Sequence, residues 1–103
     1  MSVLLEFSMF PTDRGESVSA YVARLVDIVH ASGLAYRLGP MGTTIEGDAQ
    51  AVFDVVQRCL GDLQRDTRRV AALIKLDWRA GRKDGLDAKV AAVAARLDHP
   101  VAT

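Results

Sequence analysis

Six polar side chains that could bind a ligand occupy alternate positions in three segments with strand character. They are Glu6, Ser8, Thr44, Glu46, Lys75 and Asp77. Because successive side chains of a strand point to opposite faces of the sheet, the members from each segment share one face. Carboxylates held close together repel each other unless a cation lies among them, and one lysine meets that need only in part. The cluster therefore favours a cationic ligand, or one whose N–H groups donate hydrogen bonds to a carboxylate.

The same face carries three apolar side chains, from Leu4, Phe10 and Leu73. A water-exposed polar face is the simpler interpretation of the cluster, because antiparallel sheets commonly alternate apolar and polar residues. Water does not favour three large apolar side chains, however. This observation favours a face that covers a ligand or another protein surface.

The elements that must position these residues follow from hydrophobic periodicity, turn residues and helix caps. In chain order we expect strand Val3–Phe10, a helix from an N-cap at Ser17 to about Ala31, strands Tyr36–Leu38 and Thr43–Glu46, a helix from an N-cap at Asp48 to about Arg65, strand Val70–Trp78, and a helix from about Leu86 to Leu97. This order is the split βαβ pattern of a ferredoxin-like α+β sandwich with an extra C-terminal helix. Right-handed crossovers predict an antiparallel sheet of strand order 4-1-3-2, with the first two helices on one face.

The predicted sheet thus has a helix-covered face and an open face. Alternation assigns an apolar set to the helix-covered face, namely Val3, Leu5, Phe7, Met9, Ile45, Ile74, Leu76 and Trp78. The six polar residues fall on the open face. Trp78 is therefore expected in the core rather than as a platform for a stacked ring.

The length and charge of the chain limit its class. A chain of 103 residues is enough for one domain, which we expect to span residues 1–103. Its 13 basic and 13 acidic residues give zero formal net charge, which argues against a dedicated nucleic-acid binder or polybasic membrane attachment. Low net charge leaves self-association possible.

The reactive side chains favour binding over catalysis. Cys59 is the single cysteine, and it lies in an apolar helical stripe without metal-ligand spacing, so no metal site is expected. His30 and His99 are expected at the surface, and no nucleophile–base pair is evident. The N-terminus lacks a signal-peptide pattern and no apolar run is long enough to span a membrane, so a cytoplasmic location is expected.

Four segments resemble one known family in order and spacing: Met1–Pro11, Gly15–Ser19, Pro40–Gly47 and Ile74–Arg79. They are similar to the small thiamine-binding protein family, which is related to the YkoF-like hydroxymethylpyrimidine binders. The resemblance covers Ser2 to about Leu97. It implies a ferredoxin-like fold that associates through open sheet faces into dimers or tetramers. It also implies non-catalytic binding of thiamine or a related pyrimidine, without a further cofactor, in thiamine supply, transport or salvage.

The matching segments contain the six polar residues, so the resemblance implies that they form the ligand site. Glu46 or Glu6 would accept a hydrogen bond from the aminopyrimidine, with Ser8 and Thr44 as neutral contacts. Phe10 or Met41 would cover the ring. The site would lie where two sheets meet face to face.

Two alternatives remain from the residues. The chain could be a ligand-free oligomerisation or regulatory module, in which Leu4, Phe10 and Leu73 would be interface residues. It could also be a small enzyme on the same fold, such as an acylphosphatase-like hydrolase. Arg14 follows the first strand, as that chemistry requires, but the segment Met9–Gly15 does not resemble the anion-binding loop.

Overall fold

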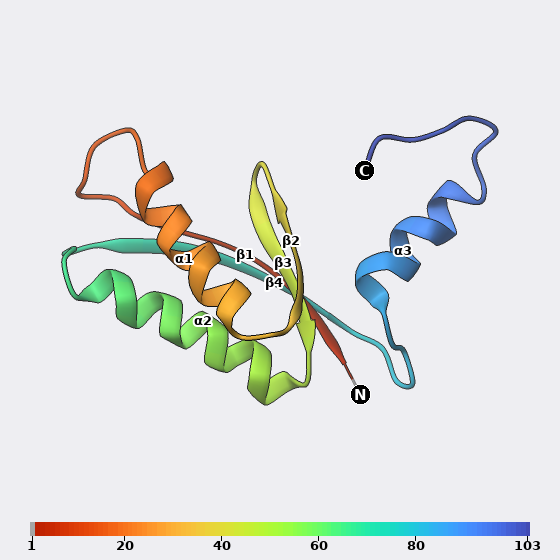
Figure 1. The fold of residues 1–103 in the computed structure, drawn as a ribbon, viewed down its shortest axis with the longest axis horizontal. Coiled ribbons are helices and arrows are strands. Elements are labelled where there is room, and N and C mark those ends of the chain that lie inside the picture. The colour runs from red at the N-terminus through yellow and green to blue at the C-terminus, as the bar shows by residue number, and fades with distance from the viewer. Residues whose placement is uncertain (1) are drawn as a thin grey trace.

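A computed structural model describes residues 2–103, so Met1 of the predicted domain and of its first segment lies outside the described residues. Within that range the elements are β1 (Val3–Pro11), α1 (Ser19–Ala31), β2 (Ala35–Gly39), β3 (Gly42–Gly47), α2 (Ala49–Gln64), β4 (Val70–Trp78) and α3 (Gly85–Ala94) (Figure 1). The predicted order of strands and helices is confirmed.

The strands form one antiparallel sheet of order β2-β3-β1-β4, which is the predicted 4-1-3-2 arrangement read from the other edge. The ferredoxin-like α+β fold is therefore confirmed. β1 pairs with β4 from Val3 to Pro11, but with β3 only from Val3 to Phe7. The last residues of β1 thus extend beyond β3.

The core lies between the sheet and the pair α1 and α2. The apolar residues of β1 that were expected on the helix-covered face are buried, as is Ile45 of β3. On α2 the buried residues are Val52, Val55, Val56, Cys59 and Leu63, whereas Phe53 and Leu60 are exposed. Alternation with a period of two explains the outcome for the strands, because it places the apolar side chains of each strand on one face. Figure 1 shows α1 and α2 together on one side of the strands.

The expected burial of β4 is wrong. Ile74, Leu76 and Trp78 lie opposite the buried Phe7, Leu5 and Val3, so they do point to the helix side, but about half of each residue is exposed. β4 is an edge strand, and α2 packs more closely against β1 than against β4. The face to which each β4 side chain points therefore followed from strand alternation. The extent of its burial depended on where α2 packs.

Two helix starts differ from expectation. α1 begins after Val18 rather than Ser17, and the carbonyl of Val18 accepts hydrogen bonds from the N–H groups of Tyr21 and Val22. α3 covers Gly85–Ala94, a shorter and slightly earlier span than expected. Its N-cap residue, Asp84, has a φ of 56°, a left-handed conformation that Asp tolerates better than most residues.

The position of α3 was not predicted. It packs against β2 and β3 on the face opposite α1 and α2. An ion pair of 2.7 Å joins Arg37 Nη2 of β2 to Asp87 Oδ1 of α3. The open face is therefore partly covered by the chain's own C-terminal helix.

Candidate functional site

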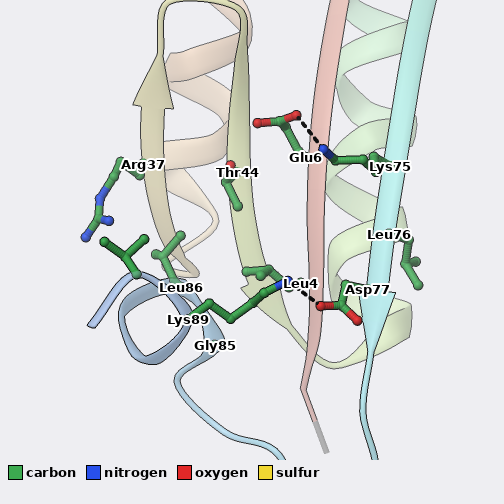
Figure 2. A pocket seen from close by; sticks show the side chains of 11 residues that line it. Leu4, Glu6, Arg37, Thr44, Lys75, Leu76, Asp77, Gly85, Leu86 and Lys89 are labelled. Atoms are coloured by element: carbon green, nitrogen blue, oxygen red, sulfur yellow. Dashed lines mark hydrogen bonds and ion pairs between the residues drawn. The ribbon is translucent and has the colours of Figure 1, made fainter. Parts of the chain in front are cut away.

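A cavity of about 310 Å³ lies on the open face, between the strands and α3 (Figure 2). Its volume is at the lower end of the roughly 300–1,000 Å³ typical of small-molecule sites. The strands contribute Leu4, Glu6, Arg37, Thr44, Lys75, Leu76 and Asp77. The helix α3 contributes Gly85, Leu86, Lys89 and Val90. We call this space the open-face cavity.

Strand register explains why four of the predicted residues meet at this cavity. Glu6 lies directly opposite Thr44 on one side and Lys75 on the other. Asp77 lies opposite Leu4. Directly opposite residues of an antiparallel pair point to the same face with their Cβ atoms roughly 5 Å apart. Period-two alternation in three strands therefore brings these side chains to one place.

Asp77 is already held by two cations. Its Oδ2 accepts hydrogen bonds from Lys89 Nζ at 2.6 Å and from Arg82 Nη1 at 2.8 Å. These two bonds, first that of Lys89 and then that of Arg82, lower the pKa of Asp77 to about 2. Sequence reasoning missed both cations, because neither lies on a strand of the sheet.

We expect this lowered pKa to make the attachment of α3 sensitive to acid. The pKa of Asp77 falls from an ordinary value of 3.8 to about 2 in the folded chain, so its contribution is complete above about pH 4 and is lost as the pH falls through 2. Acid titration followed by hydrogen exchange of α3 should therefore show lower protection factors below pH 4, each taken relative to the intrinsic exchange rate at that pH. Asp77→Asn should exchange faster already at pH 7; a variant indistinguishable from the parent at both pH values would contradict this role.

Glu46 points to the open face but does not line the cavity. It is 8% exposed. Its Oε2 accepts hydrogen bonds from the backbone N–H of Gly85 at 2.7 Å and from Ser2 Oγ at 3.1 Å, and its Oε1 accepts one from the N–H of Leu86 at 3.2 Å. A carboxylate at a helix N-terminus satisfies unpaired N–H groups and interacts favourably with the helix dipole. Glu46 thus anchors the start of α3.

Glu6 is the predicted carboxylate with the most remaining acceptor capacity. Its side chain is 48% exposed, and its ion pair with Lys75 Nζ is long, at 3.9 Å. Figure 2 shows Glu6 and Lys75 extending toward each other over the floor of the cavity. Of the three carboxylates, Glu6 can therefore accept hydrogen bonds from a ligand without first losing a close partner.

The remaining predicted residues line a different cavity. Ser8, Phe10 and Met41 lie around a space of about 320 Å³ between the end of β1, the start of α1 and the β2–β3 turn, which we call the hairpin cavity. It forms where β1 extends beyond β3. Gly42 of the hairpin cavity lies beside Glu6 of the open-face cavity, because a Cβ at Gly42 would be 3.3 Å from Glu6 Cγ.

The other reactive groups lie elsewhere. Cys59 is fully buried, and desolvation raises the pKa of its thiol to about 11, which makes it a poor nucleophile. His30 Nδ1 lies 2.8 Å from the Tyr36 hydroxyl. Among residues 2–103, no group of His, Cys, Asp and Glu side chains is arranged to hold a metal ion. No helix in the same range has the length and apolarity needed to cross a membrane.

The sequence matches a known family model and known relatives over most of its length. The family model described as "Thiamine-binding protein" matches residues 5–94. UPF0045 protein Mb1933 of Mycobacterium bovis is 43% identical over 97% of this chain and 99% of its own length. UPF0045 protein YqgV of Bacillus subtilis is 38% identical over 75% of this chain and 79% of its own length.

A solved structure with the same fold is that of MJ1052 from Methanocaldococcus jannaschii. It superposes with a TM-score of 0.84 at 27% identity, over 89% of this chain and 95% of the other. The superposition extends the agreement from sequence to the arrangement of the elements.

Proposed function

The chain belongs to the thiamine-binding protein family, and from this premise we propose that it binds thiamine or a related pyrimidine, such as hydroxymethylpyrimidine, in the open-face cavity. The observation that supports the proposal most directly is Glu6, a carboxylate with spare acceptor capacity on the floor of a cavity of suitable size. The role is binding without catalysis, in cytoplasmic thiamine supply, transport or salvage.

The chemistry of the cavity suits such a ligand. The exocyclic amine of an aminopyrimidine donates a hydrogen bond to Glu6, and a thiazolium cation is attracted by the same carboxylate. Leu4, Leu86 and Val90 supply apolar contact for the rings. A hydrogen bond to a charged group contributes about 1.5–3 kcal/mol, so a few contacts with ring burial reach the roughly −8 kcal/mol of micromolar affinity.

The other predicted residues keep distinct roles in the proposal. Thr44 is a neutral contact beside Glu6, while Ser8, Phe10 and Met41 contact a ligand that extends past Gly42 into the hairpin cavity. Glu46 acts at a distance from the ligand by holding α3. Association of two chains through their open faces is also part of the proposal. Because α3 covers β2 and β3, the second sheet would stack over β1 and β4.

Mass spectrometry of small molecules released from the purified protein, followed by calorimetry, tests the proposal. We expect micromolar binding of thiamine, a thiamine phosphate or hydroxymethylpyrimidine. The matched control is the thiazole alcohol fragment, which lacks the aminopyrimidine and should bind at least tenfold more weakly. Absence of both a copurifying pyrimidine and a calorimetric signal for all these ligands would refute the proposal.

A further inference from the structure

The helix α3 forms a wall of the open-face cavity without belonging to the hydrophobic core. Of its ten residues, all of which the structure describes, Gly85 alone is buried. On its outer side, Val93 is 60% exposed. Burial of apolar side chains is the main favourable contribution to packing. The sheet therefore holds α3 much less strongly than it holds α1 and α2.

Charged groups keep α3 in place. Glu46 accepts hydrogen bonds from the N–H groups of its first two residues, at 2.7 and 3.2 Å. Lys89 Nζ binds Asp77 Oδ2 of β4 at 2.6 Å, and Asp87 Oδ1 accepts a bond from Arg37 Nη2 of β2 at 2.7 Å (Figure 2). We call these two contacts the α3 ion pairs. Their side chains are between 44% and 76% exposed, so each pair contributes little and salt weakens it.

The segment before α3 has the backbone of a hinge. It comprises residues 79–84, between the end of β4 and the start of α3. Gly81 has a φ of 75° and Asp84 a φ of 56°, so two of its six residues are left-handed. Rotation at a few such loop residues is enough to move a helix. Residues 95–103 contain no helix or strand that returns to the sheet.

The helix α3 is too short to stay helical away from the sheet. It has ten residues, and isolated helices shorter than about 12–15 residues are marginal in water. Undocking therefore unfolds α3. Leu86, Lys89 and Val90, which line the open-face cavity, then leave it together. The cavity is complete only while α3 is folded.

We propose that α3 folds and unfolds against the sheet in the ligand-free protein, and that a bound ligand holds it in the folded position. The ligand part of this inference rests on the function proposed above, whereas the opening of α3 does not depend on it. A ligand in contact with both the strands and α3 binds the closed form alone. It therefore shifts the equilibrium toward that form.

Hydrogen exchange of the ligand-free protein tests the opening. We expect the amides of Gly85–Ala94 to have lower protection factors than those of α1 and α2, because they open without global unfolding. Raising NaCl from 0.05 M to 1 M should accelerate exchange in α3 by about two- to thirtyfold, because salt screens both α3 ion pairs. Exchange in α2 should change little. Equal protection of α3 and α2 at both salt concentrations would overturn the proposal.

Arg37→Gln removes one α3 ion pair from the strand side and leaves the sequence of α3 intact. We expect exchange in α3 to be about two- to fivefold faster at low salt, with a smaller response to added salt. Arg58→Gln is the matched control, because it makes the same charge change at an exposed position of α2. It should keep the parental rate. An α3 in Arg37→Gln that exchanges like the parent would contradict the proposal.

Gly81→Ala tests the hinge. A Cβ at this position would meet nothing within 4 Å, but a φ of 75° is unfavourable for any L side chain. The closed position thus becomes less stable, and exchange in α3 should be about five- to thirtyfold faster. Gly61→Ala in α2 is the control, because its Cβ also has free space and no positive φ is imposed on it. Parental exchange in Gly81→Ala, or an equal acceleration in both variants, would count against the hinge.

Thiamine tests the coupling. At 100 times its Kd it should slow exchange in α3 by up to about 100-fold. Trypsin cleavage after Lys89, which requires an unfolded α3, should slow as well. If calorimetry shows that thiamine binds while exchange in α3 is unchanged, the coupling is wrong and the proposed function stands. If no pyrimidine binds, the proposed function and the coupling both fail, and the salt and Gly81→Ala experiments still decide whether α3 opens.

Discussion

Glu6→Gln is expected to weaken thiamine binding by about 10- to 150-fold. The amide keeps the size of the side chain but loses its charge and one of its acceptor oxygens, and a hydrogen bond to a charged group contributes about 1.5–3 kcal/mol. Calorimetry of the variant with thiamine and with hydroxymethylpyrimidine measures the effect. The affinity for thiamine should fall more than the affinity for the neutral pyrimidine, because the thiazolium cation is no longer attracted by a negative charge at residue 6.

The control for this experiment is Glu16→Gln, which makes the same charge change in an exposed loop. Its affinity should equal that of the parent. Stability should change little in Glu6→Gln, because Glu6 is half exposed and its ion pair with Lys75 spans 3.9 Å. Parental affinity in Glu6→Gln would remove Glu6 from the site.

Glu46→Ala is expected to release α3 from the sheet. The substitution leaves the N–H groups of Gly85 and Leu86 without their acceptors, at about 1–3 kcal/mol for each while they stay buried. If α3 leaves the sheet, these two N–H groups bond to water instead. The loss of stability therefore cannot exceed the free energy with which α3 docks on the sheet. We expect amide exchange within Gly85–Ala94 to accelerate about 100-fold, with little change in α1 and α2.

Glu46→Gln is the graded comparison, because its single carbonyl oxygen can still accept one of these hydrogen bonds. Its exchange should be intermediate between the parent and Glu46→Ala. Since α3 also forms a wall of the open-face cavity, Glu46→Ala should weaken ligand binding together with α3 protection, whereas Glu6→Gln should affect binding alone. Weaker binding with fully protected α3 amides would instead place Glu46 in contact with the ligand.

Much of the fold could be predicted from local patterns. Alternation in Val3–Phe10 and Val70–Trp78 assigned the correct face to each side chain, because the period of a strand is two whatever surrounds it. The order of the elements and the right-handed crossovers then left one sheet topology. The placement of Glu6 beside Thr44 and Lys75 followed from these two facts.

Burial and bonding partners could not be predicted in this way, because they depend on elements far apart in the sequence. Glu46 has the same alternation signal as Glu6, yet it is buried under the first residues of α3, more than 35 positions later in the chain. Ile74 and Trp78 have the signal of core residues, yet α2 leaves them half exposed at the sheet edge. Local sequence therefore specified the face of the sheet to which each side chain points. Only the packing of distant elements determined which side chains on that face remain exposed.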